Sequence, residues 1–212
     1  YLNYKCSLNS FFSIFTSFLK MGYSEQQKAN LRKLLDRYDT SKDGSLTFDE
    51  FLNFLKALPN ADLSDDNFNA DEVQESDNGL NLRQIRFLYD GMDLDGSHSL
   101  SDEEIIHYLE ATQAQDFKYI TKLIFRGADK DRSRKVSIAE IKDAVTGLGS
   151  GNFDEASFQE KCKLELGEKK KELEYWEFYK IITGETLDSK SVDADPYEGK
   201  LPEEKSKCCL LL

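Results

Sequence analysis

The chain has 212 residues, which is enough for one large domain or two small ones. Its 40 acidic residues against 28 basic ones give a net charge of −12, and this surplus argues against nucleic acid as a partner. The four cysteines are too few and too scattered for a disulfide framework, and none has zinc-ligand spacing, so we expect a reducing compartment. No apolar run reaches the roughly 18 residues that a membrane-spanning helix needs.

Residues 1–20 contain an aromatic run from Phe11 to Leu19 that is open to two interpretations. The run could be the core of a signal peptide, although no convincing small-residue cleavage site follows it. Alternatively, Met21 is the initiator and residues 1–20 are not native. We favour the second interpretation and treat residues 1–20 as a separate segment.

Two helices are predicted on either side of residues 39–50. The first begins after Ser24, a residue suited to a helix N-cap, and its apolar residues recur at helical spacing. The second follows Glu50 and is expected to end at Pro59, because proline cannot continue a helix. The pattern predicts a helix–loop–helix unit.

The intervening loop has oxygen ligands at fixed spacing. Positions 1, 3, 5, 9 and 12 carry oxygen-bearing side chains, and position 7 offers its backbone carbonyl: Asp39, Ser41, Asp43, Thr47 and Glu50, with Ser45 at position 7. Gly44 stands at position 6 and Leu46 at position 8. This pattern resembles the calcium loop of the EF-hand superfamily. The resemblance implies a calcium ion held by six to eight oxygens, two of them from Glu50.

Residues 60–80 are acidic, rich in turn-forming residues and poorly periodic. No register of this stretch supplies both the early oxygen ligands and an apolar position 8. We predict a long mobile connection with no more than a short helix.

A second loop of the same kind spans residues 93–104. Its ligands would be Asp93, Asp95, Ser97, the Ser99 carbonyl, Ser101 and Glu104. Leu100 stands at position 8, but His98 replaces the glycine of position 6, where a positive φ is needed. The helix entering this loop is predicted from an apolar stripe of Leu82, Ile85, Leu88 and Met92. We expect calcium here with lower affinity than in the first loop.

A third loop spans residues 129–140. Its ligands would be Asp129, Asp131, Ser133, the Lys135 carbonyl, Ser137 and Glu140. Val136 stands at position 8, and Arg134 replaces the position 6 glycine. Further basic residues, Lys130 and Arg132 among them, crowd this loop, so repulsion and strain are both expected to lower its calcium affinity.

A fourth loop, residues 166–177, keeps only the outline of the motif. Leu173 and Glu177 suit positions 8 and 12, whereas position 1 is Leu166 and position 5 is Lys170. Because an ammonium group would compete for the space of a divalent ion, we predict that this loop pairs with the third and binds no metal.

The expected fold is all-α: two EF-hand pairs whose loops make short β contacts. Leu46 should pair with Leu100, and Val136 with Leu173. Residues 21–110 would form the first pair, with the acidic insert at about 60–80 inside it, and residues 111–185 the second. The junction at residues 110–115 is predicted either to continue a helix or to act as a hinge.

Residues 186–212 lose hydrophobic periodicity and are predicted to be a flexible tail. The tail ends in Cys208-Cys209-Leu-Leu-Leu212, a C-a-a-X pattern that indicates prenylation of Cys209, with Cys208 a weaker palmitoylation candidate. Two lipid signals would suffice for stable anchoring. We therefore expect a cytoplasmic protein that lies peripherally on the cytosolic face of a membrane.

The resemblance implies a calmodulin-like calcium sensor with about three bound calcium ions, and with Mg²⁺ as an occupant at rest. Such a sensor would expose an apolar groove to a target protein or peptide helix. A calcium buffer and a constitutive regulatory subunit of a membrane complex are the alternatives. No catalytic arrangement is recognisable, so we expect no enzyme activity. Because Gly44 is the only glycine at position 6, loop 39–50 is predicted to bind calcium first and most tightly.

Overall fold

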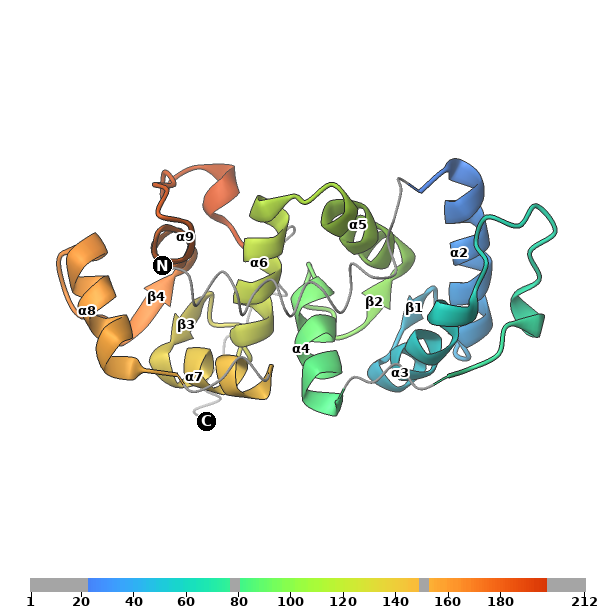
Figure 1. Cartoon of the computed structure of the whole chain (residues 1–212), viewed down its shortest axis with the longest axis horizontal. Helices are drawn as coiled ribbons and strands as arrows, with labels where there is room; N and C mark the ends of the chain where they lie inside the picture. Colours follow the sequence, from blue (N-terminus) through green and yellow to red (C-terminus); the bar gives the residue numbers. More distant parts are fainter. Residues whose placement is uncertain (1–22, 77–80, 149–152, 198–212) are drawn as a thin grey trace, which may run out of the picture.

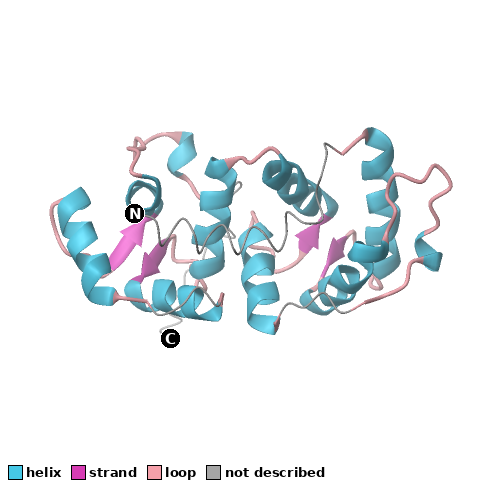
Figure 2. Ribbon diagram, viewed as in Figure 1, coloured by secondary structure: helices cyan, strands magenta, loops and turns pink. Residues whose placement is uncertain are grey.

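The computed structural model describes residues 23–76, 81–148 and 153–197, which form four helix–loop–helix units (Figures 1 and 2). The first two units comprise α2 (Glu25–Tyr38), β1 (Ser45–Leu46), α3 (Phe48–Ala57), α4 (Leu82–Met92), β2 (Leu100–Ser101) and α5 (Asp102–Gln113). The last two comprise α6 (Phe117–Ala128), β3 (Lys135–Ser137), α7 (Ile138–Gly147), α8 (Glu155–Leu166), β4 (Glu172–Glu174) and α9 (Tyr175–Thr183). Short 3-10 helices are η1 (Leu58–Asn60), η2 (Ala70–Glu72) and η3 (Val192–Ala194). The prediction of an all-α fold is confirmed.

The strands join the units in pairs, as predicted. β1 lies antiparallel to β2 with Leu46 opposite Leu100, and β3 lies antiparallel to β4 with Val136 opposite Leu173. All four of these side chains are almost completely buried. The apolar residue at position 8 of each loop therefore does two things: it sets the register and closes the core beneath the loops.

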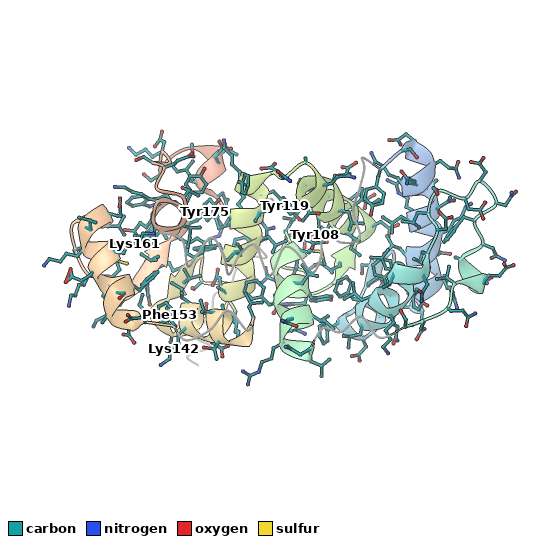
Figure 3. The ribbon with its side chains drawn as sticks, viewed as in Figure 1. Tyr108, Tyr119, Lys142, Phe153, Lys161 and Tyr175 are labelled. Carbon is teal, nitrogen blue, oxygen red and sulfur yellow. The ribbon has the colours of Figure 1, made fainter. Side chains whose placement is uncertain are left out.

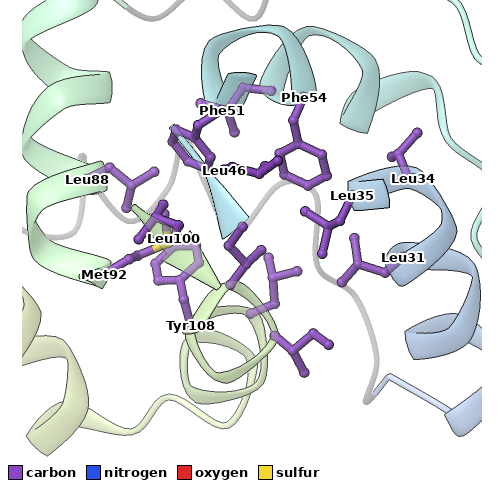
Figure 4. Close-up of a cluster of buried hydrophobic side chains, with 14 of the residues drawn as sticks. Leu31, Leu34, Leu35, Leu46, Phe51, Phe54, Leu88, Met92, Leu100 and Tyr108 are labelled. Carbon is purple, nitrogen blue, oxygen red and sulfur yellow. The ribbon is translucent and has the colours of Figure 1, made fainter. Parts of the chain in front are cut away.

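Buried side chains from all four helices of the first pair form one core (Figure 4). In Figure 4, Phe54 of α3 lies toward Leu35 of α2, Phe51 lies toward Leu88 of α4, and Leu46 lies between the two phenylalanines. The entering stripe of α4 is correct at three of its four positions. Leu82 is the exception and is 66% exposed, because it is the first residue of α4 and lies beyond the packed face.

The insert at residues 60–76 is packed, which corrects our expectation of a loose connection. Its apolar residues Leu63, Phe68 and Val73 are buried in the first core. The buried Asn30 amide of α2 donates to the Leu63 carbonyl at 3.0 Å and the Asp65 carbonyl at 2.8 Å. The side chain of Arg37, also on α2, donates to the carbonyls of Ala70 and Val73. Two polar side chains of α2 thus donate hydrogen bonds to four backbone carbonyls of a segment that has little regular structure.

The two pairs meet through α4 and α6, which lie side by side at the centre of the molecule (Figure 1). Glycines make the approach close. A Cβ at Gly91 would lie 2.7 Å from the Leu123 carbonyl oxygen, and one at Gly127 would lie 2.7 Å from the Phe87 carbonyl oxygen. The cores also exchange side chains: Tyr119 of α6 joins the first core beside Tyr108 (Figure 3), while Phe87 of α4 joins the second. The junction that we predicted is a turn at residues 114–116 between α5 and α6.

Replacing Gly127 by alanine is expected to destabilise the protein by about 1–3 kcal/mol, because the added methyl group meets backbone atoms of α4 that cannot move aside freely. Gly147→Ala in α7 is the matched control. A Cβ there would meet only the Arg83 side chain, at 3.8 Å, so its effect should be neutral or slightly stabilising. Urea denaturation of both variants checks this. Equal stability of the two variants would refute close helix packing at Gly127.

Residues 186–197 of the tail fold back onto the second pair, which corrects the prediction of a flexible segment over these residues. After α9 the chain returns to α6, and Tyr197 is 2% exposed. Residues 198–212, including Cys208 and Cys209, lie outside the described residues, as do residues 1–22. Within the described residues, none of the helices has the length and apolar character to cross a membrane.

Candidate calcium-binding loops

The position 1 aspartates are placed by the ends of the entering helices. Asp39, Asp93 and Asp129 are the C-cap residues of α2, α4 and α6, and each is buried. The carboxylate of each accepts hydrogen bonds from backbone N–H groups later in its loop. In all three, the Oδ2 atom accepts from position 6: Gly44 at 2.9 Å, His98 at 3.1 Å and Arg134 at 3.0 Å. The loop backbone therefore wraps around this first carboxylate.

The position 12 glutamates are placed by the starts of the exiting helices. Thr47, Ser101 and Ser137, at position 9, are the N-caps of α3, α5 and α7, and each forms a capping box with its glutamate. The other carboxylate oxygen reaches back to the N–H of position 2: Thr40 at 2.8 Å from Glu50, Leu94 at 2.7 Å from Glu104, and Lys130 at 3.3 Å from Glu140. One side chain thus connects the exiting helix to the beginning of its loop.

The remaining predicted ligands lie around the same loops. Ser97 and Ser133 at position 5 donate to the position 7 carbonyls of Ser99 and Lys135, each at 3.0 Å. In the first loop the position 3 hydroxyl of Ser41 donates to Asp39 at 2.9 Å. Position 5 there, Asp43, accepts from the backbone and side chain of Ser45. In the second and third loops, Asp95 and Asp131 at position 3 accept from the N–H of position 5.

Carboxylates converge in two of the loops. Asp93, Asp95 and Glu104 each offer an oxygen within 4.8 Å of the others, and so do Asp129, Asp131 and Glu140. Loop 39–50 forms no such set among the described residues, because its position 3 residue is Ser41 and its third carboxylate is at position 5. Every ligand atom in these two sets is a carboxylate oxygen, and oxygen is the ligand type that calcium takes. The residues present fit a calcium ion.

The pKa values of these carboxylates are shifted in opposite directions in different loops, although burial by itself raises each of them. Burial raises the pKa of Asp129 to about 6, and it also raises the pKa values of Asp93 and Glu104. By contrast, the hydrogen bond from the Thr40 side chain helps to lower the pKa of Glu50 to about 2. Buried, crowded carboxylates need a positive counter-charge to remain ionised, and a divalent cation supplies it.

Backbone strain in the loops arises at position 4 as well as at position 6. Position 6 has a positive φ in all three loops, as expected: 85° at Gly44, 65° at His98 and 64° at Arg134. Position 4 also has a positive φ in all three loops: 57° at Lys42, 73° at Gly96 and 57° at Arg132. A left-handed conformation costs a non-glycine residue about 1–2 kcal/mol. Loops 39–50 and 93–104 therefore hold one strained residue each, and loop 129–140 holds two.

The fourth loop places an ammonium group between two of its carboxylates. The Lys170 Nζ atom lies 2.8 Å from an oxygen of Glu177 and 2.8 Å from one of Glu168. These hydrogen bonds raise the pKa of Lys170 above its usual value. The competition for the metal position that we predicted from Lys170 has a geometric basis, and the absence of metal from this loop stays a prediction.

Two contacts to the position 1 aspartates come from outside their loops, and the sequence pattern did not reveal them. Arg132 reaches Asp93 of the second loop, and Tyr197 of the tail reaches Asp129 of the third. Asp39 of the first loop accepts only from groups of its own loop among the described residues.

Tyr89 connects the first two loops. Its hydroxyl lies 3.0 Å from the Leu46 carbonyl and 2.7 Å from the His98 carbonyl, and its side chain is buried. Tyr89→Phe is expected to lower the free energy of unfolding by about 1–2 kcal/mol, since the buried Leu46 carbonyl and the part-buried His98 carbonyl both lose this hydroxyl donor. Thermal or urea unfolding measures the loss. Tyr38→Phe, which removes a part-buried hydroxyl 3.2 Å from Glu75, should cost less than about 0.5 kcal/mol. A larger loss from Tyr38→Phe than from Tyr89→Phe would contradict this.

Comparison with known protein families matches residues 30–59 to the EF-hand domain. The match begins inside α2, covers loop 39–50 and ends in η1, so it includes the first helix–loop–helix unit. The fold and the oxygen ligands of the loop agree with it. The chain therefore carries an EF-hand domain over residues 30–59, and this domain indicates calcium binding.

Proposed function

We propose that the chain is a calcium sensor that binds about three calcium ions through loops 39–50, 93–104 and 129–140. At rest, Mg²⁺ would occupy the same oxygen ligands. Calcium would supply two positive charges to each set of carboxylates. The described structure holds the apolar side chains of each pair inside its core, so a sensor would have to expose part of that surface to bind a target helix.

One observation carries this proposal: the position 12 glutamate is at once a predicted calcium ligand and a part of the exiting helix. Glu50, Glu104 and Glu140 each belong to the capping box of α3, α5 or α7 and reach back to the start of the loop. A change in the position of this carboxylate must therefore move the helix, the loop or both. The helices of the first pair bury Phe51 and Phe54, so their movement would expose aromatic surface.

Calcium titration in the presence of a dye that fluoresces on apolar surface tests the proposal. Dye fluorescence should rise with calcium in the wild type and should not rise in a variant carrying Glu→Gln at positions 50, 104 and 140. Glutamine keeps the capping box, so this control changes the ligand charge without removing the helix cap. Calcium binding without any change in dye fluorescence would favour a buffer over a sensor.

The core limits the kind of target. Among the described residues, Met92 is the only methionine, and the buried surface consists largely of Phe, Leu and Ile. A groove without pliable methionine side chains adapts to fewer partners. We infer a small set of targets and no enzyme activity.

Co-purification of a partner that survives calcium chelation would instead support a constitutive subunit, with the paired loop 166–177 as a fixed surface.

We propose a peripheral location on the cytosolic face of a membrane, through prenylation of Cys209 and palmitoylation of Cys208. The proposal rests on the sequence Cys208-Cys209-Leu-Leu-Leu212 alone. Mass spectrometry of the native protein should detect the two lipids and the loss of the last three residues. An unmodified Leu212 would rule the anchor out.

A further inference from the structure

Residues 195–197 of the tail are seated on loop 129–140. η3 and the residues after it run beside α6, at the red end of the described chain in Figure 1. Asp195 forms an ion pair with Arg134 at 3.0 Å, and the buried Arg126 side chain donates to the Pro196 carbonyl at 2.6 Å. Lys118 of α6 pairs with Asp193 at 3.3 Å. Residues 193–196 are thus held by contacts from both α6 and the loop.

Tyr197, the last residue that the structure describes, packs against this loop. Its hydroxyl donates to the Oδ2 atom of Asp129 at 2.8 Å. Its ring carries two guanidinium groups of the same loop, with Arg132 at 5.4 Å and Arg134 at 5.6 Å from the ring centroid. Contacts of this kind help to fix the position of an arginine side chain.

Arg132 extends from this ring to the other pair of units. Its Nη2 atom lies 2.6 Å from the Oδ2 atom of Asp93, and its Nη1 atom donates to the Asp93 backbone carbonyl at 3.1 Å. The Asp93 side chain is 0% exposed and the Arg132 side chain 14% exposed, so solvent screens this pair poorly. Asp93 is the position 1 ligand of loop 93–104. The guanidinium group of Arg132, from loop 129–140, is therefore bound to the position 1 ligand of loop 93–104.

We propose that Arg132, held in place by Tyr197, is a positioning residue that lowers the calcium affinity of loop 93–104 according to whether the tail is seated. The inference rests on the proposed calcium binding by this loop. A calcium ion and the guanidinium share one carboxylate and repel each other, so each weakens the binding of the other by the same factor. Calcium at loop 93–104 thus loosens Arg132, and an unseated tail raises the affinity of that loop.

The experiment isolates loop 93–104 in the full chain by placing Glu50→Gln and Glu140→Gln in one background, and it measures calcium binding by calorimetry. In that background Arg132→Gln should raise the association constant about threefold or more. Lys130→Gln is the matched control. It removes the same charge from the same loop, but Lys130 is about half exposed and pairs with Asp143, so the change should stay below about twofold.

Tyr197 tests the part played by the tail. Tyr197→Ala should raise the affinity of loop 93–104 in the same direction as Arg132→Gln, and combining the two should add little. Tyr197→Phe keeps the ring beneath the guanidinium groups and should leave this loop within about twofold of the background. Circular dichroism verifies that each variant is folded.

Equal effects of Arg132→Gln and Lys130→Gln, or no effect of Tyr197→Ala, would overturn the inference. A background that takes up no calcium would count against the proposed function at this loop. If that background binds no calcium, calcium binding that appears on adding Arg132→Gln would still support the inference. Continued absence of calcium binding would overturn it.

Discussion

Calcium saturation is expected to raise the free energy of unfolding by several kcal/mol relative to the chelator-treated protein. An ion that binds only the folded state stabilises it by about 2.7 kcal/mol at a free concentration 100 times its Kd, hence by roughly 8 kcal/mol for three independent sites. The ligands support such an effect because buried aspartates such as Asp93 and Asp129 lie close to other carboxylates. Urea denaturation with calcium and with chelator measures the difference.

The control for this experiment is the variant with Glu→Gln at positions 50, 104 and 140. It should unfold at the same urea concentration with and without calcium, while keeping its helix content in chelator because glutamine also completes a capping box. A wild-type unfolding curve that is identical with and without calcium would contradict calcium binding by the folded loops.

Single Glu→Gln substitutions are expected to have unequal effects, with Glu50→Gln removing more of the calcium response than Glu104→Gln or Glu140→Gln. Each change removes one negative charge from a ligand that we expect to supply two oxygens, and should weaken its own loop at least tenfold, about 1.4 kcal/mol or more. At low calcium concentration the loop with the highest affinity holds most of the bound calcium, so the substitution in that loop removes the largest part of the response. Calorimetric titration of the three variants gives the comparison.

The structure changes the reason for this ranking. Loops 39–50 and 93–104 carry equal strain, one non-glycine residue with a positive φ in each. What favours loop 39–50 is that Asp39 accepts only from its own loop among the described residues, whereas Asp93 also holds the Arg132 guanidinium. Loop 129–140, with two strained residues, should be the weakest. Equal losses from all three substitutions would refute this order.

Much of the fold could be predicted from the sequence because the calcium loop is a local pattern. The position 8 residues gave the strand register, and Ser24 gave the start of α2. The strain at position 4 escaped prediction because Lys42 and Arg132 are not residues that indicate a positive φ. Gly96 at the same position of loop 93–104 was the one available signal.

The two irregular segments could not be predicted, for a shared physical reason. Residues 60–76 and 186–197 are held by side chains of distant helices that bind their backbone carbonyls: Asn30 and Arg37 for the first, Arg126 for the second. Contacts of this kind leave no periodicity in the segment itself. Buried side chains, Phe68 among them in the first segment and Tyr197 in the second, add apolar contacts to these hydrogen bonds.

Calcium binding by three loops is the central claim, and the number of calcium ions bound per chain tests it most directly. Equilibrium dialysis of the full chain against saturating calcium, with Mg²⁺ present at about millimolar concentration, should give three calcium ions per chain. A value of two or fewer would contradict the assignment of three competent loops, and a value of zero would contradict the calcium function as a whole.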